Sequence, residues 1–219
     1  APVAEEEVVS FPKLPDGWIY TRLGNVIDEP KYGTSKKCNY DIKGIGVFRI
    51  PNVAHGVINS EDMKYASFSD AEAEAYKLNE GDIVTIRSNG SINLVGKCAL
   101  IDANDTKYLY AGYLIRLRPN SDLADGSYLI NALNSIQLRQ QIESKAKSTS
   151  GVNNINSGEL QSLIIPMCSK EEQSISTKLV EEKLESSDRL LKGLSIQQIK
   201  AEKNKQSVLA SAFSGVLYG

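Results

Sequence analysis

The segment GDIVTIRSNGSINLVGKCALID, residues 81–102, contains two β-rich stretches on either side of a polar turn. Residues 82–86 and 93–101 are rich in β-branched and apolar side chains, and the polar run 87–91 separates them. Within that run, Asn89 and Gly90 form a dipeptide that accepts positive φ and is typical of tight hairpin turns. We therefore expect a β-hairpin that reverses at Asn89-Gly90.

Shorter patterns predict further strands and helices on both sides of this hairpin. Alternating residues predict strands over 46–52, ended by Pro51, and over 108–118, ended by Pro119. An Ala- and Glu-rich stretch over 69–76 and the apolar spacing within 126–145 predict helices, and 160–166 predicts a last strand or a link. The polar stretches 30–46 and 145–157 predict loops. Long ordered loops are uncommon in compact domains unless they carry a function.

The sequence changes in character at Ser169. Ser169 and Glu172 form a capping box that predicts the start of a helix, and no proline follows up to Gly219. A helix of roughly 40 residues would be about 60 Å long. An imperfect heptad stripe runs along it, and its members are Val180, Leu184, Leu191, Leu194, Ala201, Val208 and Ala212. An isolated helix cannot bury such a stripe, so we expect it to pack on another helix; an unpaired structural helix is the alternative.

Composition excludes several classes of protein. The net charge of -2 argues against binding DNA by bulk electrostatics alone, although local basic groups could still read it. One histidine and three scattered cysteines, Cys38, Cys98 and Cys168, predict reduced thiols and no metal site. No nucleophile-elbow motif occurs, and the stretch after Gly90 lacks phosphate-loop spacing. We therefore expect a non-catalytic chain without a cofactor of its own.

Four motifs, in order along the chain, resemble the specificity subunit of type I restriction–modification enzymes. LPDGWIYTRLG at 14–24 resembles that family's domain-opening pattern, and residues 81–101 resemble its central GDxLxxRxNGSxxLVGK element. SGVNNINSGELQSLIIPMCSKEEQ at 150–173 resembles its closing pattern, with Met167-Cys168 where the family usually has a second proline. NKQSVLASAFSGVL at 204–217 resembles the end of its helix. Each match alone is weak, but four in the right order are specific.

The resemblance implies an α+β fold and a division of the chain into three parts. Residues 1–13 would be a linker, 14–168 a globular DNA target-recognition domain with a curved, mostly antiparallel β-sheet and flanking helices, and 169–217 a long coiled-coil-type helix. Family members usually carry two such halves with approximate two-fold symmetry. This chain shows one half, so it is either a natural half-subunit or a fragment, and the acidic segment 5–11 favours a C-terminal half. A half could dimerise through its helix.

The resemblance also implies partners. The domain would read one half of a bipartite site in double-stranded DNA, and the helix would set the gap between half-sites and dock methyltransferase subunits. Those subunits would bind S-adenosylmethionine and methylate adenine, and restriction subunits with motor activity, which use ATP and Mg²⁺, would complete the complex. No membrane is implied: no apolar run is long enough to cross a bilayer and the N-terminus lacks a signal-peptide core, so we expect a cytoplasmic protein.

DNA reading needs hydrogen-bonding and cationic side chains on protruding loops. Three loops and a fourth point around Arg49 offer them, although each could equally be a solvated turn, and Arg87 or Arg49 could instead pair with an internal carboxylate such as Asp82. The residues assigned to DNA contact are Lys31, Tyr32, Gly33, Thr34, Ser35, Lys36, Lys37, Arg49, Asn52, His55, Arg87, Ser88, Asn89, Gly90, Ser91, Lys97, Lys145, Lys147, Ser148, Ser150, Asn153 and Asn154.

Three other functions remain open at this point. The globular domain could bind a protein, which would make the chain an adaptor with a coiled-coil arm. It could be a recognition domain cut from a single-chain restriction–modification enzyme. A catalytic role is the third.

Overall fold

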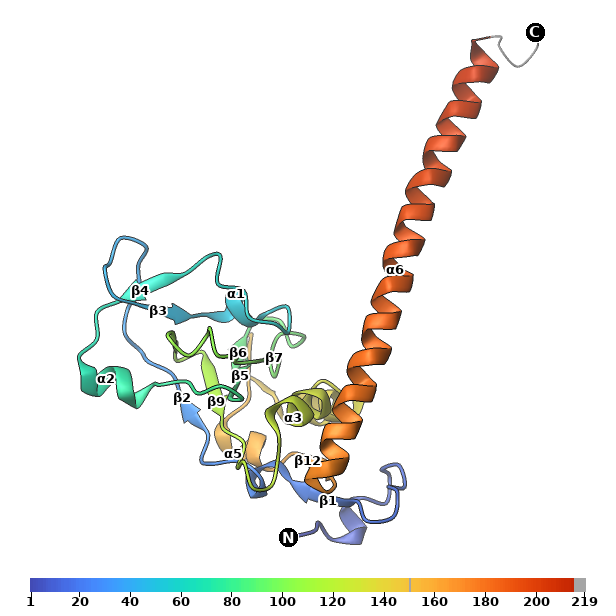
Figure 1. Ribbon diagram of the computed structural model, residues 1–219. Helices are drawn as coiled ribbons and strands as arrows, with labels where there is room; N and C mark the ends of the chain where they lie inside the picture. The colour runs from blue at the N-terminus through green and yellow to red at the C-terminus, as the bar shows by residue number, and fades with distance from the viewer. Residues whose placement is uncertain (150, 215–219) are drawn as a thin grey trace. The chain divides into compact units, whose positions relative to one another are not determined.

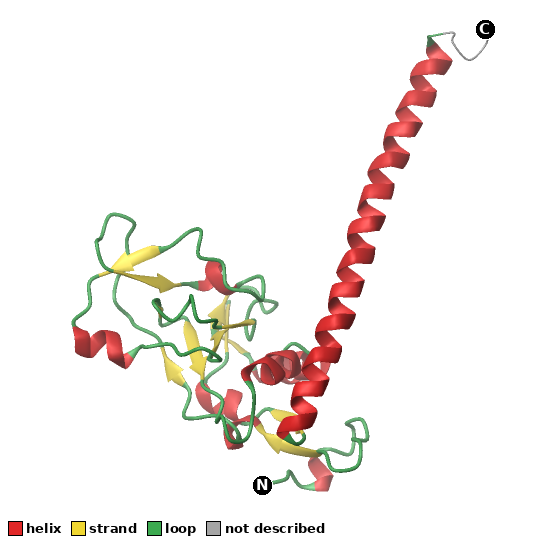
Figure 2. Cartoon of the chain, in the orientation of Figure 1, coloured by secondary structure: helices red, strands yellow, loops and turns green. Residues whose placement is uncertain are grey.

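The computed structural model describes residues 1–149 and 151–214, with the side chains of 147–149 left aside. The chain divides into two compact units, Ala1–Ser176 and a second one that begins at Thr177. Strands and helices intersperse in the first unit and one long helix makes up the second, so the predicted α+β fold is confirmed (Figure 2).

A four-stranded antiparallel sheet forms the centre of the first unit. Its order is β2 (Lys31–Tyr32), β9 (Leu114–Leu117), β5 (Ile83–Ile86) and β7 (Cys98–Leu100). All four residues of β5 and of β9 are buried. Strands buried on both faces need apolar or β-branched side chains at nearly every position, which is what these two segments carry.

Three smaller sheets surround this one. β4 (Lys64–Ala66), β3 (Ile45–Phe48) and β8 (Leu109–Tyr110) form one, in which β3 and β8 run parallel. β1 (Ile19–Arg22) pairs with β12 (Ile164–Met167). β10 (Lys147–Thr149), β11 (Val152–Asn154) and β6 (Ser88–Asn89) form the third sheet. All strand pairs except β3–β8 are antiparallel, as expected.

The predicted central hairpin is right in its pairing and wrong in its turn. β5 pairs with β7, but the chain does not reverse at Asn89-Gly90. Asn89 continues in the extended strand β6, because β11 lies beside it and supplies backbone partners. The chain turns back over 91–97 instead, where Gly96 adopts a φ of 78°. The second predicted strand, 93–101, shrinks to β7.

Helices occupy the segments between the strands. Both helical segments predicted before Ser169 are present. The first is α2 (Asp70–Ala75), which Ser69 and Glu72 cap. The second, 126–145, divides into α3 (Gly126–Leu133) and α4 (Ile136–Lys145). Where we expected a strand over 46–52, β3 ends at Phe48 and Pro51 lies in the first turn of α1 (Ile50–Val53), since proline suits that position. The remaining elements are α5 (Ser157–Gln161) and the 3₁₀ turns η1 (Glu5–Glu7) and η2 (Leu23–Asn25).

Two hydrophobic clusters cover the two faces of the central sheet. The period of two along a strand divides their members: Ile83 of β5 joins one cluster, and Val84 and Ile86 join the other. Leu129 and Ile142, from α3 and α4, complete the first cluster, whereas the second takes side chains from β3, α1 and β8. The sheet is therefore fixed from both sides, which keeps its strand ends in place.

The N-terminal segment 1–13 contacts strand β1. The backbone N–H of Val3 donates to Tyr20 O, and the ring of Phe11 packs edge-on against that of Tyr20 with 5.2 Å between centroids. Arg22 forms an ion pair with Glu7 at 2.5 Å. These contacts add the N-terminal segment to the edge of the β1–β12 pair.

The predicted long helix is present as α6 (Lys170–Phe213), drawn in orange and red in Figure 1. The capping box is confirmed, since Glu172 N donates to Ser169 Oγ at 3.2 Å and Ser169 N donates to the Glu172 carboxylate. The first two turns belong to the globular unit. There Gln173, 0% exposed, donates to Leu123 O and Cys168 O and accepts from Asp125 N.

Beyond Ser176 the predicted stripe of α6 is solvent-exposed. Val180, Leu184, Leu191, Leu194 and Val208 are all exposed, and Ala201 is too, whereas Ala212 is half-buried. Residues 215–217, the predicted end of the helix, lie outside the described part of the chain. Within the described residues, no helix is long and apolar enough to cross a membrane.

Candidate nucleic-acid interface

Antiparallel pairing brings several predicted loops to one end of the central sheet. Residues 33–37 follow β2 and residues 87–91 follow β5, while Lys97 precedes β7 and 111–113 precede β9. Since neighbouring strands run in opposite directions, the carboxyl ends of β2 and β5 lie beside the amino ends of β9 and β7. We call this edge of the sheet the loop end.

The third predicted loop joins the second through β-pairing. Asn153 and Asn154 of β11 lie opposite Asn89 and Ser88 of β6, and Ile155 N donates to Arg87 O at 2.8 Å. The Asn153 amide donates to the carbonyl oxygens of Gly90 and Asn89. Residues more than sixty positions apart in sequence are thus held on one small sheet.

Not every residue of the third loop can be judged as a contact. Lys147 and Ser148 are placed only by their backbone, in β10 opposite Asn154 and Asn153, and Ser150 lies outside the described residues. Lys145 is the last residue of α4 and is half-buried.

A pocket of about 550 Å³ lies between the first and second loops, and its lining residues are 34–37, 87–88 and 111–113. Seven of the nine described lining residues carry a hydroxyl, ammonium or guanidinium group. Such groups donate hydrogen bonds to base edges and to phosphate oxygens. The pocket gives the loop end a concave surface with donors on several sides.

Arg87 is held in place by neutral groups. Its Nε donates to Asn154 Oδ1 at 3.2 Å, and its guanidinium carbon lies 4.8 Å from the centroid of the Tyr32 ring. The Tyr32 hydroxyl accepts from Ser157 N, which fixes the ring beneath the guanidinium. Among the described residues Arg87 has no carboxylate partner. Its charge is therefore oriented and uncompensated.

The carboxylate that we considered as a partner for Arg87 belongs to another arginine. Arg118 binds Asp82 through two hydrogen bonds, from Nε at 2.8 Å and from Nη2 at 2.7 Å. The alternative of an internal ion pair is thus excluded for Arg87 with Asp82.

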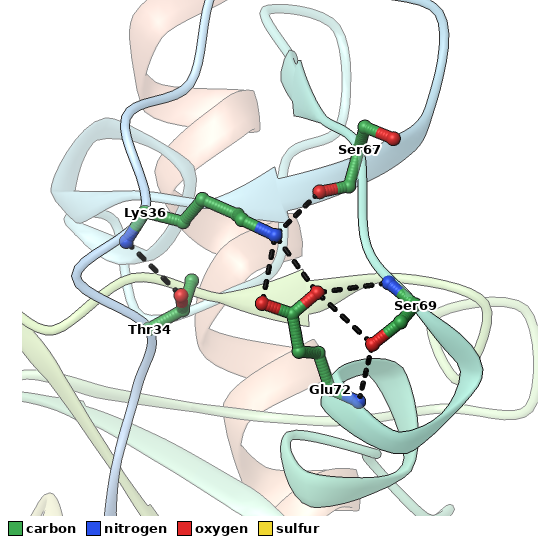
Figure 3. A network of polar contacts seen from close by, with 5 residues as sticks. All are labelled: Thr34, Lys36, Ser67, Ser69 and Glu72. Atoms are coloured by element: carbon green, nitrogen blue, oxygen red, sulfur yellow. Dashed lines mark hydrogen bonds and ion pairs between the residues drawn. The ribbon is translucent and has the colours of Figure 1, made fainter.

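Lys36 is tied to the protein, as Figure 3 shows. Its ammonium donates to both carboxylate oxygens of Glu72 at 2.8 Å and to Ser67 O at 2.7 Å, and it lies over the ring of Phe68. The hydrogen bond from Lys36, with that from Ser69 N, lowers the pKa of Glu72 to about 2. Lys36 thus braces the first loop against α2, and its charge is already paired.

The rest of the first loop combines fixed backbone with exposed side chains. Lys31 is exposed in β2, and Thr34 is buried, with its backbone bonded to Tyr110 O and to Gly112 N. A Cβ on Gly33 would lie 2.3 Å from two carbonyl oxygens, so only glycine fits there. Ser35 and Lys37 remain exposed at the pocket.

The fourth predicted point divides into structural and exposed residues. Asn52 is buried, and its amide donates to Asn59 O and Asp62 O. Arg49 forms an ion pair with Asp62 at 3.0 Å, which is the internal carboxylate pairing that we left open for it. His55 is exposed in the turn after α1. Buried or paired polar groups such as Asn52 and Arg49 stabilise the fold, and of these three residues only His55 is both exposed and without such a role.

In the second loop, Asn89 Oδ1 accepts from Ser91 N, which shapes the turn. Ser88 lines the pocket, Gly90 and Ser91 are exposed, and Lys97 is exposed beside α4 rather than in the pocket. Asn89 therefore stabilises the loop, whereas Ser88, Gly90 and Ser91 are accessible for contacts with a ligand.

Sequence reasoning missed the turn between β8 and β9. Ala111, Gly112 and Tyr113 line the pocket, and the Tyr113 side chain is 64% exposed. The alternation over 108–118 predicts one strand, which the structure divides into β8 and β9. The Ala-Gly pair at 111–112, which interrupts the alternation of apolar residues, was the signal that could have located this turn.

Among the described residues no cluster of three metal-ligating side chains occurs. Burial raises the pKa of the Cys98 thiol to about 12 and also raises the pKa of Cys38 and of Cys168, so no activated thiolate results.

Curated relatives are similar to the chain over most of its length. The specificity subunit of the type I restriction enzyme EcoKI from Escherichia coli (strain K12) is 29% identical over 194 residues, which are 88% of this chain and 42% of that subunit. The StySPI specificity subunit from Salmonella potsdam is 26% identical over 203 residues, 92% of this chain and 43% of that one. The chain spans less than half the length of these two relatives.

Solved structures share the fold. One, described as "Structural basis underlying complex assembly and conformational transition of the type I R-M system", matches 93% of this chain and 47% of its own with a TM-score of 0.71 and 20% identity. The HsdS subunit from Thermoanaerobacter tengcongensis matches 84% of this chain and 46% of its own with a TM-score of 0.60 and 16% identity. The pattern described as "Type I restriction modification DNA specificity domain" matches residues 15–201. The chain therefore belongs to the type I restriction–modification DNA specificity domain family.

Proposed function

We propose that this chain is a DNA sequence-recognition part of a type I restriction–modification complex and reads one half of a bipartite target. The observation that carries the proposal is the loop end. Two of the three predicted polar loops line one pocket there, and the third joins the second loop through β-pairing. Arg87 lines this pocket and has no carboxylate partner among the described residues. An oriented and uncompensated guanidinium beside serine and lysine side chains suits base edges and phosphates.

The division of labour follows from the charge. With a net charge of -2 the chain lacks the basic surplus of an autonomous DNA binder, so it binds DNA weakly and in a salt-sensitive way when alone. Methyltransferase subunits supply further phosphate contacts, bind S-adenosylmethionine and methylate adenine. Restriction subunits supply the ATP- and Mg²⁺-dependent motor and the cleavage. The chain itself is non-catalytic and works in the cytoplasm.

The long helix is the second functional element of the proposal. Its stripe of leucine and valine side chains is exposed, and burying such a stripe against another helix is the usual source of stability for a helix of this length. The partner is a second copy of the helix or the other half of a specificity subunit. Leu184→Glu combined with Leu191→Glu should abolish self-association in sedimentation velocity. A wild-type chain that stays monomeric at high micromolar concentration refutes self-pairing.

The direct test uses the chain assembled with its methyltransferase subunit. Its target is first identified by mapping methylated adenines in a host that carries the complete system. Arg87→Ala should weaken binding of target DNA by about tenfold or more, the range for one lost arginine–base contact. Lys107→Ala is the matched control, since it removes an exposed positive charge that precedes β8, away from the loop end. Equal affinity of the Arg87 variant and the wild type would contradict the assignment.

Two alternatives predict different results. A recognition domain cut from a single-chain restriction–modification enzyme would have methyltransferase sequence upstream in the complete gene. A protein–protein adaptor would bind the methyltransferase subunit but give no target-dependent mobility shift. The pocket at the loop end favours DNA over a protein partner, because its donors and oriented guanidinium match the groove chemistry of DNA. The upstream gene sequence alone separates the single-chain alternative.

A further inference from the structure

The turn between β8 and β9 presents a single aromatic side chain at the loop pocket. Tyr113 is 64% exposed, while its neighbours in sequence, Gly112 and Leu114, are half-buried and buried. Of the described residues that line the pocket, Tyr113 alone carries an aromatic ring. Every other large side chain of the lining is cationic.

The backbone of this turn is fixed on both sides. Tyr113 O accepts from Arg87 N at 3.0 Å, Gly112 N donates to Thr34 O at 2.7 Å, and Leu114 N donates to Ala111 O at 2.8 Å. The turn is thus tied to the loop after β5 and to the loop after β2. Little conformational entropy of the backbone is lost when such a residue contacts a ligand, which favours a specific contact over a loose one.

The pocket contains polar groups and one apolar ring, which would recognise different features of DNA. Arg87, Ser88 and Lys37 can donate hydrogen bonds to bases and phosphates, but none of them recognises the 5-methyl group of thymine. In the major groove that methyl group is the one apolar feature, and apolar side chains read it by contact. Among the described residues that line the pocket, Tyr113 is the only one with a large apolar surface that can supply this contact.

We propose that Tyr113 is a specificity-determining residue that contacts the 5-methyl group of a thymine in the half-site. The inference rests on the proposed function, because it names a base contact of the same interface. It adds the β8–β9 turn to the predicted loops as a further reading element. The phenol ring, rather than the hydroxyl group, makes the contact.

The test is a deoxyuridine scan of the target with the complex of chain and methyltransferase. Each thymine of the half-site is replaced in turn by deoxyuridine, which removes only the methyl group. One position should weaken binding by the wild-type complex about fourfold, the value for one buried methyl-sized group. For Tyr113→Ala the same substitution should have no effect, and for Tyr113→Phe the fourfold loss should remain.

The control variant and the outcomes that would refute the inference are as follows. Leu123→Ala removes another exposed apolar side chain, beyond the carboxyl end of β9 and so away from the loop end, and should keep the wild-type scan. A wild-type scan without any sensitive thymine, or a sensitive thymine that persists in Tyr113→Ala, overturns the inference while target binding still supports the proposed function. Loss of discrimination in Tyr113→Phe assigns the contact to the hydroxyl and also overturns it. A complex that binds all DNA alike refutes the proposed function itself.

Discussion

Neutralising Asp82 should destabilise the globular unit more than changing a typical surface ion pair. The Asp82 side chain is 1% exposed, and its carboxylate accepts two hydrogen bonds from Arg118 and a third from Asn79 N at 2.7 Å. In Asp82→Asn one carboxylate oxygen becomes an NH₂ group, which faces another donor whichever way the amide turns. The charge of Arg118 also loses its partner.

The magnitude follows from the burial of the pair. Removing one partner of a buried ion pair typically costs about 3–5 kcal/mol. The carboxylate is fully enclosed but Arg118 is one-quarter exposed, so the lower half of that range applies, about 3 kcal/mol. For a unit of this size, that free energy corresponds to a fall in Tm of roughly 6–12 °C.

The measurement is urea unfolding followed by the fluorescence of Trp18, the single tryptophan, which lies in the globular unit 6.4 Å from Tyr128 between ring centroids. Glu143→Gln is the control, because its exposed pair with Arg139 should contribute less than about 1 kcal/mol. A loss below about 1 kcal/mol in Asp82→Asn, equal to the control, would refute the reasoning that this pair stabilises the strand ends.

Three further predictions concern the described contacts. Lys36→Met should raise the pKa of Glu72 from about 2 toward 4.5 in an NMR titration, and an unchanged pKa would exclude Lys36 as the cause. Because the folded-state pKa of Glu72 is lowered, its contribution to stability is present above about pH 4.5 and is lost as the pH falls toward 2. Gly33→Ala should lower Tm by several degrees, whereas Gly90→Ala, whose Cβ would meet nothing closer than 3.9 Å, should not; equal melting of the two would contradict the close approach at the first loop. Cys98 should resist a thiol reagent until the chain unfolds, because its pKa is raised to about 12 and its side chain is buried; rapid labelling in the native protein would show that the core opens.

Local sequence signals predicted the elements that depend on neighbours in the chain. The capping box at Ser169 located the start of α6, and apolar runs located β5 and β9, because capping and alternation act over a few residues. The pairing of β6 with β11 was beyond such signals, since each strand has two or three residues and the partners are more than sixty positions apart. That pairing moved the turn away from Asn89-Gly90.

Strand geometry explains why Asp82 does not pair with Arg87. Asp82 and Arg87 are five residues apart in the sequence, and an ion pair between them was one of the open alternatives. Because β5 is extended between them, their backbones are separated by roughly 16 Å, and they lie at opposite ends of the sheet. Arg118 reaches Asp82 instead, since antiparallel pairing sets the carboxyl end of β9 beside the amino end of β5. Because β5 is extended, Arg87 lies at the loop end, where no carboxylate among the described residues pairs with its charge.

Backbone atoms hold most of the candidate interface together, and this has a functional consequence. The first loop is fixed by bonds of Thr34 with the chain at Tyr110 and Gly112, and the second by the ladder of β6 with β11. Side chains at the loop end therefore contribute little to holding these loops in position, apart from those such as Lys36 that bind a neighbouring element. The ion pair of Asp82 lies at the other end of the sheet. A substitution at Tyr113 or Lys37 can thus change what the pocket reads without weakening the fold, which is why binding and stability should respond to different residues.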